Sequence, residues 1–121
     1  MKLNWEQGRQ GTGYEKLELM NRWRYFSRFK WDLYLLRYRV GSGIPRHRDP
    51  LPKHKHYRLN IYLWNAKAGG VPEHDDAIIT NRWFTFFRPD LTTHSVSSVT
   101  KGTRYVLSLG FSKRLALVLP T

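Results

Sequence analysis

The chain has 121 residues, which fits a single domain, and its 40% apolar and 15% aromatic residues are typical of a globular protein. It contains no cysteine, which excludes disulfide bonds, zinc ribbons and a thiol nucleophile, and which is typical of a reducing compartment. No stretch approaches the roughly 20 apolar residues of a membrane span. The N-terminus lacks the apolar core of a signal peptide, so we expect a cytoplasmic protein without a membrane partner.

Positive charge dominates the chain, with 21 Lys and Arg against nine Asp and Glu and a net charge of +12. Such an excess favours a polyanionic partner, although a small basic protein can also carry it for solubility alone. The charge is concentrated in residues 37–58, where Asp49 is the only acid. Seven basic residues lie in this stretch: Arg37, Arg39, Arg46, Arg48, Lys53, Lys55 and Arg58. We therefore expect residues 37–58 to be a candidate contact for nucleic acid.

The first third of the chain is predicted to hold one helix. Residues 8–13, GRQGTG, are typical of a flexible lead-in. In residues 14–30, apolar side chains recur at helical spacing in Leu17, Met20, Trp23 and Phe26. This spacing predicts an amphipathic helix over 14–30, and a strand in its second half is the alternative.

The rest of the chain is predicted to be strands. Short aromatic and branched runs separated by Gly, Pro and Asn occur at 31–40, 58–64, 77–89, 95–99, 104–112 and 114–120. In the run 58–64, alternation places Leu59 and Ile61 on one face and Asn60 and Tyr62 on the other. Because the gaps after residue 31 are too short for several helices, we expect one mainly β domain, a β-sandwich or jelly roll behind one N-terminal helix.

Three side chains form a candidate metal site. His47 and Asp49 lie two residues apart after the strand that ends near Val40, and His94 precedes the strand expected at 95–99. Two imidazoles and one carboxylate can occupy one face of an octahedral Fe(II) and leave three positions open. An H-x-D pair is common by chance, and a solvated histidine in a basic loop is the alternative.

Arg104 opens the strand expected at 104–112, ten residues after His94. A buried arginine at that position needs an anionic partner. A guanidinium is the natural bidentate partner of a carboxylate, so Arg104 is a candidate for holding a carboxylate ligand. A structural ion pair with one of the few acids of the chain is the alternative.

In order and spacing, several segments match one known family. They are RYRVGSGIPRHRD, then RLNIYLW, then AGG at 68–70, and finally WFTFFRPDLTTHSVSSVTKGTRYVLSLGF. This succession resembles the Fe(II)/2-oxoglutarate-dependent dioxygenases, whose fold is the double-stranded β-helix, a jelly roll. The resemblance covers residues 36–112 and implies an oxygenase with Fe(II) as cofactor and 2-oxoglutarate and dioxygen as cosubstrates.

The resemblance also implies roles for particular residues. His47, Asp49 and His94 would be the iron ligands, and Arg104 would hold the far carboxylate of 2-oxoglutarate. Three further side chains would contact the cosubstrate: Tyr38, Asn60 and Tyr62. Ordinary aromatic packing is the alternative for the two tyrosines. One departure is Val106, which stands where some members of the family carry a serine.

The implied reaction is the hydroxylation or demethylation of a nucleobase or a protein side chain, with succinate and carbon dioxide as co-products. Asp49 favours hydroxylation over halogenation, because halogenating relatives lose this carboxylate. The competing hypothesis is a non-catalytic jelly roll that binds nucleic acid through its basic face. Two further motifs are predicted to have no catalytic role. We expect His54 and His56 to be solvated loop residues or contacts to an anionic substrate, and residues 73–76, EHDD, to be an exposed acidic loop.

Overall fold

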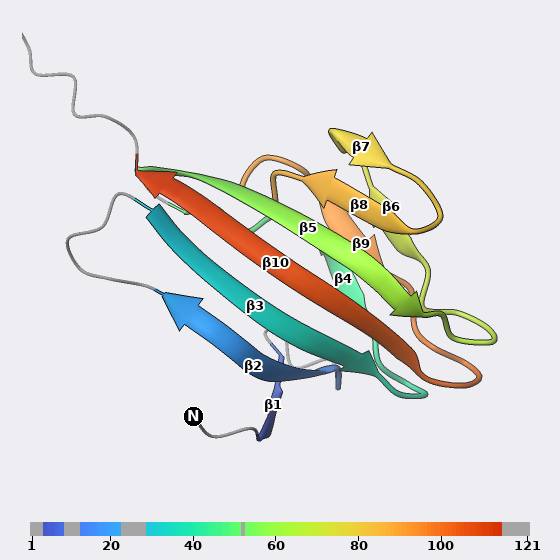
Figure 1. Cartoon of the computed structure of the whole chain (residues 1–121). Helices are drawn as coiled ribbons and strands as arrows, with labels where there is room; N and C mark the ends of the chain where they lie inside the picture. Colours follow the sequence, from blue (N-terminus) through green and yellow to red (C-terminus); the bar gives the residue numbers. More distant parts are fainter. Residues whose placement is uncertain (1–3, 9–12, 23–28, 52, 115–121) are drawn as a thin grey trace, which may run out of the picture.

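The computed structural model describes residues 4–8, 13–22, 29–51 and 53–114, and within these ranges all regular structure is β. A large sheet of seven strands has the order β1-β2-β3-β10-β5-β8-β7, and a small sheet has the order β4-β9-β6. Figure 1 shows the small sheet lying behind the large one. The described part contains no helix that is long and apolar enough to span a membrane.

The strands of the large sheet are β1 (Trp5–Gln7), β2 (Glu15–Arg22), β3 (Phe29–Tyr38), β5 (His54–Trp64), β7 (Ile79–Thr80), β8 (Phe84–Phe87) and β10 (Arg104–Arg114). Those of the small sheet are β4 (Ile44–His47), β6 (Pro72–His74) and β9 (His94–Val96). All paired strands are antiparallel, and β10 lies between β3 and β5.

The inner face of the large sheet is recognisable from β10. Its even-numbered residues from Arg104 to Ser112 are buried, while the odd-numbered residues between them are half-buried on the opposite face. The core is contributed by both sheets, since Tyr38 and Val106 of the large sheet pack with Ile44 and Val96 of the small one. Two antiparallel sheets packed face to face confirm the mainly β architecture predicted from the sequence and are consistent with a jelly-roll-like fold.

The predicted N-terminal helix is wrong for the part of it that the structure describes. Residues 15–22 form β2 and pair with β3, and residues 23–28 lie outside the described residues. The pairing shifts register between Glu18 and Met20, so one extra residue is accommodated there. This β-bulge brings Leu17 and Met20, three residues apart, opposite Leu35 and Leu33 on the same face of β3. A spacing of three therefore resembled a helical period.

The strands predicted at 31–40, 58–64, 95–99 and 104–112 correspond to β3, β5, β9 and β10, with β5 beginning four residues early at His54. The range 77–89 holds the two short strands β7 and β8. Besides β2, three strands were not predicted: β1, β4 and β6. They have three or four residues each, too few for a clear period. The strand predicted at 114–120 lies outside the described residues after Arg114.

The Gly-Gly turn leads into β6 and lies against the segment before β10. Gly69 has a φ of +73°, a conformation that favours glycine. A Cβ at Gly69 would lie 2.1 Å from the carbonyl oxygen of Ser98 and 2.9 Å from the amide nitrogen of Thr100. By contrast, Gly41 has a φ of +89° but open space around its Cβ position.

Comparing Gly69→Ala with Gly41→Ala will separate the effect of a positive φ from the effect of close backbone atoms. Both substitutions should lower the free energy of unfolding by roughly 1–2 kcal/mol because alanine is strained at positive φ. Gly69→Ala should lose about 1–3 kcal/mol more, because backbone atoms must move to admit the methyl group. Urea unfolding measures both, and equal losses would show that the Gly69 contact can relax.

Candidate active site

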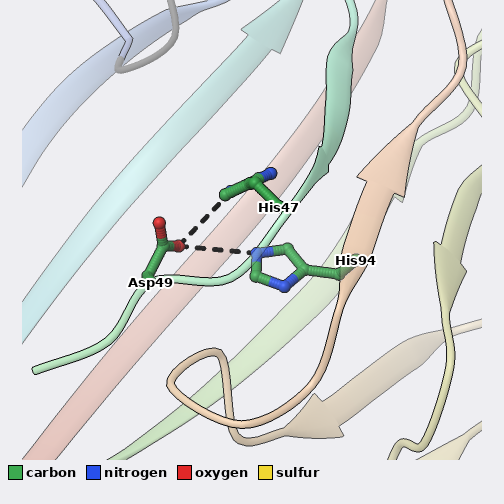
Figure 2. A group of neighbouring side chains, drawn as sticks. All are labelled: His47, Asp49 and His94. Carbon is green, nitrogen blue, oxygen red and sulfur yellow. Dashed lines mark ion pairs between the residues drawn. The ribbon is translucent and has the colours of Figure 1, made fainter.

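His47, Asp49 and His94 converge on one point between the sheets (Figure 2), and one ligand atom from each lies within 4.8 Å of the others. Asp49 Oδ2 is 3.5 Å from His47 Nε2 and 3.4 Å from His94 Nε2. All three side chains are mostly buried, with exposures of 15%, 27% and 12%. The structure therefore brings together the three residues that the sequence nominated as a metal site.

Strand pairing places these residues. His47 ends β4 and is directly opposite His94, the first residue of β9. Asp49 follows two residues later, and its backbone N–H donates to the carbonyl of Pro89, 2.7 Å away. The H-x-D segment is thus tied at one end to the small sheet and at the other to the turn after β8.

Both imidazoles are oriented by the same backbone arrangement. His47 Nδ1 is 2.7 Å from the carbonyl of Pro45, and His94 Nδ1 is 2.8 Å from the carbonyl of Thr92. Because a carbonyl only accepts, each Nδ1 must carry the proton of that hydrogen bond. When the rings are neutral, each Nε2 therefore carries a lone pair, and both Nε2 atoms face Asp49. This is the outer arrangement typical of metal-bound histidines.

A divalent cation placed between three lone-pair donors that face one another would satisfy all of them. The 3.4 and 3.5 Å separations are too long for good hydrogen bonds. Ligands at about 2.1 Å from an ion, bound at right angles, would be about 3 Å apart, close to these distances. Two imidazoles and a carboxylate, without any thiolate, suit a divalent first-row ion such as Fe(II) with open positions. The residues therefore fit such an ion.

Arg104 is buried at the start of β10, with 2% of the residue exposed. Its Nε has no hydrogen-bond partner, and no carboxylate among the described residues forms an ion pair with it. The guanidinium carbon is 5.1 Å from the ring centres of both Tyr38 and Tyr62. Burial lowers the pKa of Arg104, and the two tyrosines partly oppose this. A buried cation with an unsatisfied donor needs an anionic ligand.

Two of the metal-site residues, Asp49 and His94, line one cleft of about 370 Å³ together with Arg104. Asp49 and His94 contribute to its wall together with Arg104 and Tyr38. A bifunctional anion in this space can therefore lie next to the guanidinium and next to the metal site at Asp49 and His94. The structural ion pair considered for Arg104 is not seen in the described part of the chain.

The other predicted cosubstrate residues differ in position. Tyr38 lies opposite Arg104 on β3, is 2% exposed and stacks on Tyr14, and burial raises its pKa. The Tyr62 hydroxyl is hydrogen-bonded to the Thr85 hydroxyl. Asn60 also lines the cleft, and its Oδ1 accepts a 2.6 Å hydrogen bond from Ser108 Oγ. Ser108, the register partner of Asn60, is four residues after Arg104 on β10.

Sequence reasoning missed two histidines of the cleft. His74, in the segment interpreted as an acidic loop, is in β6 directly opposite His94, and their rings stack 5.9 Å apart. His56, interpreted as a loop residue, is in β5. Both line the cleft, and burial lowers the pKa of each to about 4. A strand after the Gly-Gly turn, with alternate residues pointing inward, was the signal available for His74.

Part of the basic stretch is neutralised by acids. Arg37 and Arg39 contact Glu15 at 2.9 and 3.3 Å, and the other two pairs, each 2.7 Å long, are Arg46–Asp75 and Arg58–Asp32. The remaining members, Arg48, Lys53 and Lys55, are exposed. The free positive charge is therefore concentrated next to Asp49 and at the start of β5.

Comparison with known proteins shows the fold. No protein-family model and no curated protein sequence matches the chain. Among solved structures, the chain is similar to the viral collagen prolyl hydroxylase of Paramecium bursaria Chlorella virus-1, solved as its 2OG complex. The TM-score is 0.55 at 18% sequence identity over 74% of this chain. The matched region spans 63% of the viral enzyme. The chain therefore shares the fold of a 2OG oxygenase.

The depressed pKa of His56 predicts a specific pH dependence of stability. In the unfolded chain His56 protonates near its ordinary pKa of 6.5, whereas in the folded chain it stays neutral to about pH 4. As pH falls through this window the unfolded state binds the extra proton, so stability drops, on the order of 1–3 kcal/mol from this group. Above pH 6.5 the contribution of neutral His56 to the free energy of unfolding is fully present.

His56→Gln should remove this part of the pH dependence, measured by urea unfolding at pH 7.5 and pH 5. Imidazole nitrogen shifts in NMR spectra should show His56 neutral at pH 5.5. A His56 that titrates near pH 6.5 in the folded chain would contradict the prediction.

Proposed function

We propose that the protein is an Fe(II)- and 2-oxoglutarate-dependent oxygenase that hydroxylates or demethylates a nucleobase or a protein side chain. One observation carries this proposal: in the described part of the chain, a buried guanidinium without a carboxylate partner shares one cleft with Asp49 and His94, two of three converging lone-pair donors. The fold shared with a 2OG oxygenase supports it independently. If Arg104 had only a structural role, no metal-ligand group would need to lie near it. If the two histidines and the aspartate met by chance, no buried guanidinium would need to lie near them.

The residues would divide the work as follows. His47, Asp49 and His94 would hold Fe(II). Arg104 would bind the far carboxylate of 2-oxoglutarate, with Tyr38 next to it. Bound together, iron and 2-oxoglutarate supply the oxidising chemistry, in which one atom of dioxygen enters succinate as carbon dioxide is lost and the other replaces a C–H bond with C–OH.

The chain also shapes the space around the reactants. Leu36, Val106 and Ile44 form an apolar wall of the cleft to which both sheets contribute. Such an apolar wall lowers the local dielectric constant and so strengthens the attraction between Arg104 and a carboxylate. The backbone carbonyls of Pro45 and Thr92 hold the protons of the two imidazoles at Nδ1, so that Nε2 stays available.

Anaerobic titration with Fe(II) and 2-oxoglutarate should produce the weak visible charge-transfer band of the chelate. His47→Ala should abolish the band because a metal ligand is lost. A variant outside the cleft, Arg82→Met, should keep it, since Arg82 is exposed and its guanidinium lies over Trp83. Absence of the band in the unmodified protein would refute the assigned cofactors.

Arg104→Met should separate cosubstrate binding from metal binding. Loss of a charged hydrogen bond of about 1.5–3 kcal/mol should weaken 2-oxoglutarate binding roughly 10- to 150-fold. Co(II) binding, followed by its visible spectrum, should be unchanged because Arg104 is not one of the three donors. Unchanged 2-oxoglutarate affinity would assign Arg104 a purely structural role.

The competing function, a basic module that binds nucleic acid without catalysis, makes a different prediction. Binding to DNA would persist without iron, no charge-transfer band would form, and affinity would fall steeply with salt. Release of succinate over a panel of DNA, RNA and peptide substrates decides between the two functions.

A further inference from the structure

The cleft continues beyond the metal site onto a polar floor formed by the large sheet. Arg58 of β5 and Asp32 of β3 form a 2.7 Å ion pair. Their strands are not neighbours, because β10 lies between them, and the residue of β10 in register with both is Gly110. The ion pair therefore passes over the central strand on its inner face.

Gly110 makes this crossing possible. A Cβ at that position would lie 2.2 Å from Arg58 Nη2 and 2.5 Å from Asp32 Oδ1. Any other residue would displace the ion pair. The side chains are 17% and 7% exposed, so the pair is largely but not fully shielded from water.

The floor continues along β10 in the direction of Arg104 through hydrogen bonds. Arg58 Nη1 donates to Ser108 Oγ at 2.7 Å, and Ser108 Oγ donates to Asn60 Oδ1 at 2.6 Å. Asn60 takes part through its oxygen, so its amide nitrogen remains a donor for a ligand. His56 lies at the other end, with Nε2 3.4 Å from Arg58 Nη2. All of these side chains line the cleft.

This floor disfavours an apolar substrate group. A pyrrolidine ring or an aliphatic chain laid on it would remove water from the ion pair and the amide without replacing their hydrogen bonds. A planar group with donors and acceptors on its edge would satisfy them. The flat guanidinium also offers a surface on which a ring can stack.

The opposite side of the cleft supports a planar group as well. Pro50 and Leu51, directly after Asp49, line the cleft there, whereas Tyr34 lies on the floor's own sheet, opposite Ser108. A ring held between these two loop side chains and the floor would lie next to the carboxylate proposed to bind iron. Lys16 also lines the cleft, and Arg48 and Lys53 are exposed on the same loop as Asp49. Positive charge therefore lies in the cleft at Lys16 and on the loop that contains Asp49, where it can contact a phosphate backbone.

We propose that the substrate group is a nucleobase of single-stranded nucleic acid, seated on the floor formed by Asp32, Arg58, Ser108 and Asn60, with the phosphates at Lys16 and Arg48. This assignment rests on the proposed oxygenase function and names its substrate class. The base edge is read by Asn60, and the oxidised atom is a base carbon or a methyl group attached to the base.

The test uses fluorescein-labelled 12-nucleotide single strands of DNA and RNA, with the full chain, Fe(II) and 2-oxoglutarate held anaerobically. A strand of equal length with abasic residues at its centre carries the same phosphates but no bases there. Anisotropy should show the intact strand of at least one nucleic acid binding roughly 10-fold or more tightly, since one stacked base contributes that much. Equal affinity for intact and abasic strands would overturn the proposal.

Variants locate the contact. Ser108→Ala and Asn60→Ala should reduce the preference for intact strands and leave abasic binding unchanged. Lys16→Ala should weaken both strands alike. Lys113→Ala is its matched control, because Lys113 is exposed and pairs with Lys55 and Phe29 on the opposite face, so it should change neither. Circular dichroism checks that each variant is folded, and loss of preference in Lys113→Ala alone would refute the assigned floor.

The chelate band separates this inference from the function on which it rests. A band that forms but is insensitive to the oligonucleotides, with succinate released on peptides instead, would refute the nucleobase and keep the oxygenase. A band that never forms refutes the oxygenase itself. A band that shifts on adding the intact strand, but not the abasic one, supports both.

Discussion

The direct pairing of His47 with His94 across β4 and β9 is the constraint on which the site depends. Residues 47 positions apart become neighbours because two short strands pair in this register and in no other. A slip of one residue would turn one imidazole to the other face of the sheet. The carbonyls of Pro45 and Thr92 then orient both rings in the same way, so register and tautomer are determined by the same small sheet.

The central strand β10 organises the rest of the cleft. Its inward residues present different chemistry in succession: a cation at Arg104, an apolar side chain at Val106 and a hydroxyl at Ser108. At Gly110 no side chain is present, and the ion pair between the neighbouring strands passes over the backbone there. Antiparallel neighbours supply the partner of each, from Tyr38 beside Arg104 to the ion pair over Gly110. One strand thus sets the order in which a cosubstrate and a substrate group could lie along the cleft.

Several features were predictable because their signal is local. The alternation in 58–64 and the branched, aromatic run 104–112 have enough residues to show a period of two, and both are strands. The H-x-D pair, the distal histidine and the arginine were recognisable by their order and spacing. The N-terminal helix was wrong because a β-bulge after Glu18 imitates a helical spacing, and only pairing with β3 reveals the extra residue.

Other features depend on contacts between distant segments. The residues around His74 are typical of an exposed acidic loop, and it enters the cleft because β6 pairs with β9. The charges of Arg37, Arg46 and Arg58 suggested a free basic surface, but acids 22 to 29 residues away neutralise them. The sequence by itself determined the mainly β fold and the residue types available for metal and carboxylate binding, since these follow from local periodicity and side-chain chemistry. Only the tertiary structure decided which donors share one point and which charges remain free, because strand register and burial arise from long-range pairing.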